Sequence, residues 1–275
     1  MNETATPIAS VPAIALIGFG EAGETFAAAA GWDDSHAAVH DLLPARTTQA
    51  RELGLKAGNA EAVLAGAELV LCLVTADQVL NAARDCAAHL APGTIWCDGN
   101  SVAPDTKRAA AAVIEAAGGL YVDVAILAPV NPARLNVPLL LAGAQAARAE
   151  TLLSAAGFAN IRVVGDEVGR ASAIKMIRSV MVKGVEALTA EMMLGAQAAG
   201  VADEVLASLD ASEKPKPWAE KAAYNIERMV THGARRAAEM EESAKTLASL
   251  GIEPLMTAGT VARQREMAGR ADRLI

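Results

Sequence analysis

Aromatic residues are scarce in this sequence of 275 residues, where Phe, Trp and Tyr make up 3% of the chain and hydrophobic residues as a whole make up 53%. The core must therefore be built from Ala, Leu, Val and Ile, a composition that suits helices packed closely on a sheet. Basic residues are outnumbered, and the net charge of −8 argues against a nucleic-acid-binding surface, which requires clustered Lys and Arg. The length predicts one large or two medium-sized domains.

Cysteine is also rare, since the chain has only Cys72, Cys86 and Cys97. Their spacing does not suit a metal site and their number is odd, so we expect buried, reduced thiols and no metal. No stretch reaches the roughly 18 uninterrupted apolar residues that a transmembrane helix needs. The first residues lack the basic start and apolar block of a secretion signal. These absences predict a cytoplasmic protein that does not bind membranes.

Three glycines near the N-terminus have the spacing G-x-G-x-x-G and directly follow an apolar segment that begins at Ile14. In a dinucleotide-binding turn, Gly18 makes the tight turn, Gly20 lets the backbone approach a pyrophosphate, and Gly23 lets helix and strand pack closely. The start of the following helix offers free N–H groups to the phosphates. We therefore predict a bound dinucleotide in contact with the turn formed by Gly18, Phe19, Gly20, Glu21, Ala22 and Gly23.

Asp41 lies at the end of a short expected strand, 23 positions after Gly18. A carboxylate at this place accepts hydrogen bonds from the ribose hydroxyls of NAD and repels the 2′-phosphate of NADP, so NAD is favoured. Two alternatives remain open. Asp41 could cap the helix that begins near Pro44, and Arg46 is close enough in sequence to neutralise a phosphate.

The arrangement of apolar segments predicts a Rossmann-type doubly wound parallel sheet, because strands alternate with helices up to about residue 165. After Gly169 only helices are expected, beginning with a long helix from Ala171 to Gly200. We predict a disordered tail over residues 1–11, an NAD(P)-binding domain over 12–167, and an all-helical substrate and dimerisation domain over 168–275. The loop from Val130 to Pro138 is expected to be exposed, where a substrate pocket could form.

Two polar segments are candidates for the chemistry once a nicotinamide is assumed. Asp98 to Lys107 follows a strand, so Asn100 and Ser101 should lie at the carboxyl edge of the sheet, where ligands bind; the alternative is that they only cap the next helix. Lys175, Arg178 and Ser179 share one face at the start of the long helix, and the alternative is a solvated stripe. Val74 and Thr75, at the end of another strand, are expected to contact the cofactor.

The segments G-F-G-E-A-G, D-G-N-S-V-A-P-D-T-K and G-R-A-S-A-I-K resemble, in this order and separation, the β-hydroxyacid dehydrogenase superfamily, which includes 3-hydroxyisobutyrate and 6-phosphogluconate dehydrogenases. The segment from His232 to Met240 and the Ala-rich end are similar to a branch with its own phosphogluconate-dehydrogenase-like helical C-terminal domain. The resemblance implies that Lys175 is the catalytic acid/base, that Ser101 and Asn100 hold the oxygen atoms of the substrate, and that Ser101 also lies at the cofactor.

Departures from the family pattern concern the substrate. Ser179 stands where an asparagine is usual, and the segment from Asp123 to Pro129 replaces a loop that has one more serine and two more glycines. We expect Asp123, Arg178, Ser179 and His232 to contribute to substrate binding, although Arg178 could pair with an internal acid and a lone histidine is usually structural. The apolar loop predicts a substrate larger and more apolar than a short hydroxy acid.

The leading hypothesis is an NAD-dependent oxidoreductase that acts on a β-hydroxy acid or related alcohol and works as a homodimer. A second hypothesis is a lyase that releases formaldehyde or CO2 through retro-aldol cleavage or decarboxylation and uses NAD without net turnover. Imine reduction is a third, because it also occurs among relatives. A non-enzymatic protein that only binds the cofactor is a further hypothesis, but such a protein would not need Lys175 as a base.

Overall fold

The computed structural model describes residues 11–212 and 215–270 and divides into two compact units, one ending at Arg178 and the other beginning at Ser179. The predicted tail lies, apart from Val11, outside the described residues. The unit boundary falls inside the long helix α7 (Arg170–Ala199), eleven residues later than the domain boundary expected from the sequence.

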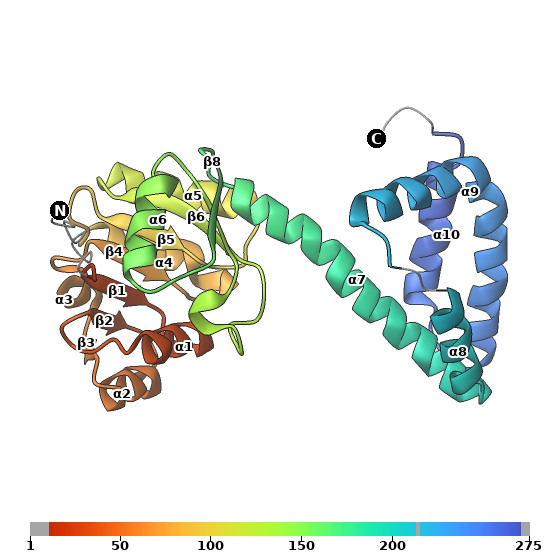
Figure 1. Ribbon diagram of the computed structural model, residues 1–275, viewed down its shortest axis with the longest axis horizontal. Helices are drawn as coiled ribbons and strands as arrows, with labels where there is room; N and C mark the ends of the chain where they lie inside the picture. The colour runs from red at the N-terminus through yellow and green to blue at the C-terminus, as the bar shows by residue number, and fades with distance from the viewer. Residues whose placement is uncertain (1–10, 213–214, 271–275) are drawn as a thin grey trace, which may run out of the picture. The chain divides into compact units, whose positions relative to one another are not determined.

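An eight-stranded sheet forms the first unit, with the strand order β3-β2-β1-β4-β5-β6-β7-β8 (Figure 1). Its strands are β1 (Ile14–Ile17), β2 (Ala37–His40), β3 (Lys56–Ala57), β4 (Leu69–Cys72), β5 (Ile95–Asp98), β6 (Leu120–Ile126), β7 (Leu139–Ala142) and β8 (Ile161–Gly165). The order of the first six strands is that of a Rossmann fold, which confirms the predicted fold class.

One strand departs from the parallel arrangement. β7 runs antiparallel to β6, because the chain between Ile126 and Leu139 carries only the short 3-10 helix η2 (Arg134–Asn136). A parallel neighbour needs a longer crossover, usually a helix. β8 follows such a crossover, α6 (Ala146–Ala155), and is parallel to β7.

Helices cover both faces of the sheet and bury two apolar clusters. The cluster on one face includes residues of α1 (Glu21–Ala30), α2 (Pro44–Glu52) and α6, with Phe26 and Phe158 in edge-to-face contact. The other face is covered by α3 (Ala60–Leu64), α4 (Val79–Ala87), which follows the 3-10 helix η1 (Ala76–Gln78), and α5 (Pro104–Ala116). These clusters consist mainly of Ala, Leu, Val and Ile, as the composition predicts.

The three cysteines lie in this unit as free, buried thiols, which confirms the expected redox state. Burial raises the pKa of Cys86 to about 12 and also raises the pKa of Cys72 and Cys97. A thiol whose pKa is raised is unreactive at neutral pH.

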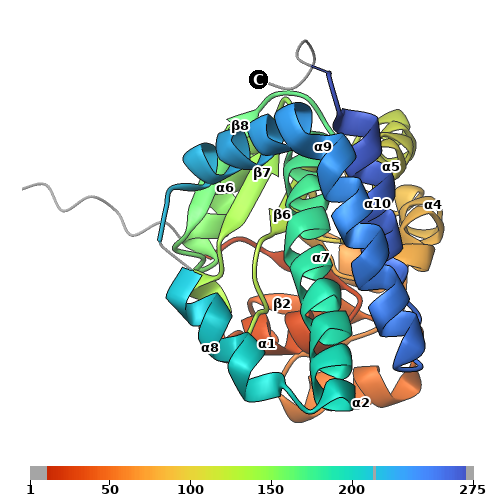
Figure 2. The same ribbon diagram turned by 90° about the vertical axis from the view of Figure 1, so that its right-hand side faces the viewer.

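The second unit consists of helices only. It contains the later part of α7 with α8 (Ala202–Ser212), α9 (Trp218–Ser249) and α10 (Leu255–Met267), and α9 and α10 pack side by side (Figure 2). The carboxylate of Glu191 on α7 accepts hydrogen bonds from the backbone N–H groups of Met256 (2.7 Å) and Thr257 (2.8 Å) at the start of α10. Within the described ranges, none of the helices has the length and apolar character needed to cross a bilayer.

Candidate active site

The local structure requires two of the three glycines in the N-terminal turn, and the third leaves open space. Gly18 has a φ of +90°, and a Cβ there would lie 2.5 Å from the carbonyl oxygen of Leu73. A Cβ on Gly23 would lie 3.1 Å from the carbonyl oxygen of Gly18, so this glycine allows α1 to pack against the turn. A Cβ on Gly20 would meet nothing within 4 Å. Open space therefore lies beside Gly20, where a pyrophosphate would need to approach the backbone.

Helix α1 begins directly at this open space. Gly20 is its N-cap residue and provides no side-chain hydrogen bond to the first turn. The first N–H groups of a helix are unsatisfied within the helix and favour an anion. Glu21 and Ala22 line the neighbouring cavity, whereas the side chain of Phe19 is buried in the core. These residues fit the phosphates of a dinucleotide.

Replacing Gly20 by alanine is expected to weaken NADH binding about tenfold or more, equivalent to ~1.4 kcal/mol, because the new methyl group would occupy the space beside the turn. The free energy of unfolding should change by no more than about 1 kcal/mol, since the methyl group contacts nothing in the protein. Fluorescence titration with NADH and thermal unfolding measure the two effects.

Gly259→Ala is the matched control, because a Cβ on Gly259 of α10 also meets nothing within 4 Å. It should leave NADH binding unchanged. If Gly20→Ala bound NADH as tightly as the unmodified protein, the phosphates would not lie at this turn.

Asp41 connects the glycine turn to the end of β2. One carboxylate oxygen accepts a hydrogen bond from the backbone N–H of Phe19 (2.7 Å), and the other accepts one from Leu43 (2.8 Å), the N-cap residue of α2. A carboxylate can accept about four hydrogen bonds, so these two leave capacity for ribose hydroxyls. Arg46 donates instead to Gln49 (2.9 Å). Asp41 thus braces both the turn and the start of α2.

A cavity of about 340 Å³ lies at the carboxyl ends of β1, β4, β5 and β6, within the first unit. Ligands bind at this edge in open parallel sheets. The lining residues are Glu21, Ala22, Leu73, Val74, Ala76, Gly99, Asn100, Ser101, Ile126, Ala128, Pro129, Val130 and Lys175. The cavity therefore joins the start of α1, the polar turn after β5, the apolar loop after β6 and the first turns of α7.

Lys175 and Ser101 meet in this cavity. Lys175 Nζ donates a hydrogen bond to Ser101 Oγ over 2.5 Å, although the two residues are 74 positions apart in the sequence. Lys175 is half-buried and Ser101 is exposed. A lysine can transfer protons and a serine hydroxyl can both donate and accept, so the pair provides a polar centre on a largely apolar floor.

Asn100 lies beside this pair and is held rigidly. Its side-chain amide donates to Asp98 Oδ1 (2.6 Å) and Cys72 Sγ (3.4 Å), and its backbone N–H also donates to Asp98 Oδ1 (2.9 Å). Its role in substrate binding stays a prediction. The helix-capping alternative does not describe this turn, since α5 has Ala103 as its N-cap residue and no side-chain cap.

Asp123 requires a correction, because it does not line the cavity and is completely buried. Asp123 Oδ2 accepts hydrogen bonds from the backbone N–H groups of Gly169 (3.1 Å) and Ser172 (2.9 Å), at the start of α7. A carboxylate is favourable at the start of a helix. Asp123 therefore anchors the helix that carries Lys175 and has no exposed surface for a ligand.

The other expected substrate residues lie on α7 and α9. Arg178 Nη1 donates to the carbonyl oxygen of Leu127 (3.3 Å), which ties α7 to the loop after β6. Ser179 is the first residue of the second unit, and His232 is an exposed residue of α9 in that unit. Their contribution to substrate binding stays a prediction.

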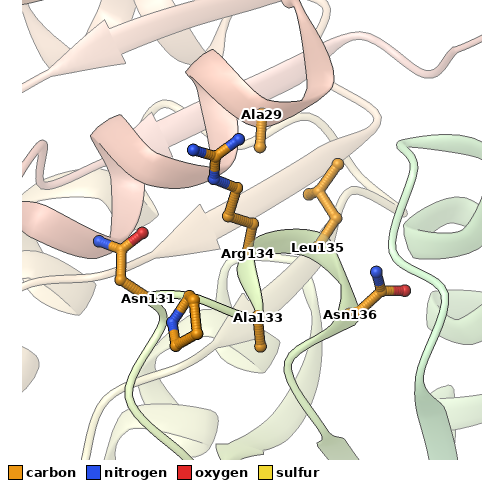
Figure 3. Close-up of a pocket in the computed structure, with 7 residues that line it drawn as sticks. Ala29, Asn131, Ala133, Arg134, Leu135 and Asn136 are labelled. Carbon is orange, nitrogen blue, oxygen red and sulfur yellow. The ribbon is translucent and has the colours of Figure 1, made fainter.

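Two further expectations concern the rim of the site. Val74 lines the cavity, whereas Thr75 lies next to it as the N-cap residue of η1. The loop predicted over residues 130–138 contributes only Val130 to the cavity. Its next residues, Asn131 to Asn136, enclose with Ala29 a separate hollow of about 450 Å³, which the side chain of Arg134 faces (Figure 3). None of the predicted site residues lines this hollow.

The sequence analysis did not predict a buried ionic cluster that lies beneath the site. Lys107, Asp98 and Asp123 are all 0% exposed, and Tyr121 donates a hydrogen bond to Asp98 Oδ2 (2.5 Å). Burial, followed by the neighbouring Asp98 carboxylate, raises the pKa of Tyr121. The sequence feature that could have indicated this cluster is the presence of an aspartate in each of two consecutive strands.

In the described part of the chain, no group of three His, Cys, Asp or Glu residues could hold a metal ion.

Comparisons with known proteins agree with the fold. Residues 13–165, more than half of the chain, match the family described as the NAD binding domain of 6-phosphogluconate dehydrogenase, and residues 196–267 match a domain of unknown function, DUF1932. A conserved hypothetical protein from Sinorhizobium meliloti 1021 is 36% identical, with coverage of 98% of this chain and 92% of that chain and a TM-score of 0.63.

Another solved structure is the conserved protein MTH1747 of unknown function, described as structurally similar to 3-hydroxyacid dehydrogenases. It is 31% identical, with coverage of 92% of this chain and 96% of that chain and a TM-score of 0.61. An imine reductase from Myxococcus stipitatus, solved with NADP+, has a TM-score of 0.75 over 93% of each chain. Its identity is 18%, so this likeness concerns the fold alone.

Proposed function

The chain belongs to the family that carries the NAD-binding domain of 6-phosphogluconate dehydrogenase, and on this premise we propose that it is an NAD-dependent oxidoreductase acting on a β-hydroxy acid or related alcohol. The observation that carries the proposal is the hydrogen bond between Lys175 Nζ and Ser101 Oγ, in a cavity that also contains the start of α1. A proton-transferring amine thus shares one cavity with the residues that fit the cofactor.

The proposed chemistry assigns a separate task to each residue. Ser101 Oγ hydrogen-bonds the substrate hydroxyl, and Lys175 Nζ accepts the hydroxyl proton while the substrate carbon loses a hydride; in the reverse direction Lys175 returns the proton. Bound NAD supplies the hydride acceptor.

NAD is the proposed cofactor because Asp41 lies at the end of β2. A carboxylate there accepts hydrogen bonds from ribose hydroxyls and opposes the charge of a 2′-phosphate. Structures of Myxococcus stipitatus imine reductase proteins contain NADP+ and, in the V8 variant, NAD+, so fold alone does not determine this choice. The carboxylate of Asp41 is the feature of this chain that favours NAD.

The proposed substrate has an apolar substituent. The cavity is lined at the end of β6 and in the loop after it by Ile126, Ala128, Pro129 and Val130, whose apolar side chains favour a hydrocarbon group over a short, highly polar acid. A substrate with a bulky apolar part suits this lining.

Cofactor titration and a turnover screen test the proposal together. NADH should bind at least about tenfold more tightly than NADPH, a difference of ~1.4 kcal/mol. The screen offers NAD with β-hydroxy acids of increasing apolar size and follows the absorbance of reduced nicotinamide. Absence of binding to either cofactor would refute the proposal. Release of formaldehyde or CO2 without accumulation of reduced cofactor would favour the lyase alternative.

We also propose that the second unit mediates a homodimer. Its helices expose large apolar side chains, including Val185, Leu188 and Leu194 on α7 and Leu206 and Leu209 on α8. Contiguous exposed apolar residues often mark protein interfaces. Light scattering on the purified protein checks the proposal, which a monomer at all concentrations would contradict.

A further inference from the structure

Two buried aspartates lie side by side in the sheet beneath the candidate site. Asp98 on β5 and Asp123 on β6 are register partners on adjacent strands. Like charges in such positions repel each other. The ammonium group of Lys107, on α5, lies 3.0 Å from Asp98 Oδ1 and 3.5 Å from Asp123 Oδ1, with all three side chains fully buried. Lys107 therefore provides the positive charge that allows both carboxylates to be buried.

The ammonium group makes different contacts with the two aspartates. Its three acceptors within hydrogen-bond distance are the carbonyl oxygen of Asp98 (2.5 Å), Asp98 Oδ1 (3.0 Å) and the carbonyl oxygen of Val124 (3.4 Å). An ammonium has three protons, so these contacts satisfy its donors. Asp123 Oδ1 is buried and makes no hydrogen bond. Charge attraction alone therefore links Lys107 to Asp123.

Each aspartate holds one half of the candidate site. Asp98 Oδ1 accepts two hydrogen bonds from Asn100, the residue directly before Ser101. Asp123 Oδ2 accepts hydrogen bonds from the backbone N–H groups of Gly169 and Ser172, which lie six and three positions before Lys175. The turn that carries Ser101 and the helix that carries Lys175 are thus attached to the same buried ammonium group, one through Asp98 and the other through Asp123.

We propose that Lys107 is a positioning residue that fixes the distance between Ser101 Oγ and Lys175 Nζ through Asp98 and Asp123. The inference deepens the proposed function and rests on it for its catalytic meaning. Errors of about 1 Å in the placement of reacting groups can cost about 100-fold in rate. A buried charge network that joins the two supporting segments restrains their separation more firmly than contacts at the surface, which water competes for.

Competitive acetylation tests this link without a substrate or a cofactor. The protein is treated with trace acetic anhydride, and peptide mass spectrometry gives the labelling rate of Lys175 relative to Lys183, an exposed lysine of the same helix. Protection of the buried Lys107 from the label shows in the same experiment that the fold is intact. The variants are Asp123→Asn, which weakens the anchor of α7, and Asn100→Ala, which weakens the anchor of Ser101.

Two control variants show how the labelling of Lys175 responds to a broken contact and to a change elsewhere in the cluster. Ser101→Ala removes the hydrogen-bond partner and shows the effect of a broken contact on the labelling of Lys175. Tyr121→Phe removes one hydrogen bond from Asp98 Oδ2, within the same cluster, but leaves the hydrogen bonds to Asn100 and to the start of α7 in place. A general loosening of the cluster would affect this variant as well.

We expect Asp123→Asn and Asn100→Ala to raise the labelling rate of Lys175 relative to Lys183 at least about threefold, which is the effect of losing a weak hydrogen bond. Tyr121→Phe should change this labelling ratio by less than about 1.5-fold. Should one anchor variant fail to protect Lys107, the other carries the test. An unchanged ratio in a folded anchor variant overturns the proposal, and so does an equal rise in Tyr121→Phe.

The same protein samples are titrated with NADH. If the unmodified protein does not bind NADH but the anchor variants shift the labelling ratio, the proposed function fails and the link through Lys107 stands. If NADH binds and the ratio does not move, only the link is refuted.

Discussion

Replacing Lys107 by methionine is expected to lower the free energy of unfolding by about 3–5 kcal/mol, because the change leaves two carboxylates buried without their counter-charge. Methionine nearly matches the length of the lysine stem, so little packing is lost. Both Asp98 and Asp123 are fully buried and cannot turn to water without opening the sheet. A loss of this size is a large part of the total stability of an ordinary domain, about 5–15 kcal/mol.

Tryptophan fluorescence during urea unfolding is the suitable measurement for this variant. Trp32 and Trp96 are buried in the first unit, so their emission reports on the unit that contains Lys107, whereas Trp218 of α9 is already exposed. Lys56→Met is the matched control, since Lys56 is an exposed lysine of the same sheet, and its change should stay within about 0.5 kcal/mol.

A double variant identifies the cause. Adding Asp123→Asn to Lys107→Met removes one of the two stranded charges, so the double variant should be more stable than the sum of the two single effects predicts. A loss below about 1 kcal/mol for Lys107→Met would mean that the cluster is not ionised as described.

Replacing Lys175 by alanine is expected to lower the rate of turnover by about 10²–10⁴, the usual contribution of a general acid/base. The amine is the proposed proton acceptor, and Ser101, its hydrogen-bond partner, has no comparable basicity at neutral pH. NADH binding should be retained, because the glycine turn and Asp41 do not depend on this side chain. The loss should therefore appear in the rate and not in cofactor affinity.

The measurement uses the best substrate from the turnover screen, with NADH titration as the companion experiment. Lys183→Ala removes an exposed amine from the same helix and should leave the rate unchanged. If Lys175→Ala kept a rate within about tenfold of the unmodified protein, proton transfer would have to be assigned to another group.

Local signals in the sequence predicted most of the first unit. The alternation of strands and helices up to about residue 165 predicted the doubly wound sheet, and Gly18 and Gly23 have the tight turn and the close packing expected of them. β3 escaped prediction because it has two residues, Lys56 and Ala57, which show no periodicity. The antiparallel direction of β7 depends on a connection without a crossover helix, and a sequence pattern does not reveal strand direction.

The sequence predicted those parts of the site that are formed by one local motif. It did not predict those parts in which residues distant in the sequence come into contact. Asp41 was singled out because its distance from the glycine turn is typical of a ribose-binding acid. Asp123 was assigned to the substrate, but its partners Gly169 and Ser172 lie 46 and 49 positions further along the chain. The sequence analysis did not single out Lys107, because only the register of β5 and β6 places two aspartates against it.

The burial of Cys72, Cys86 and Cys97 makes the chain a convenient host for site-directed labels. Because each native thiol is shielded and holds its proton at neutral pH, a cysteine introduced on the surface would be the one that reacts with a maleimide dye or spin label. Probes attached to α7 or to the loop after β6 would then report on ligand entry without prior removal of the native cysteines.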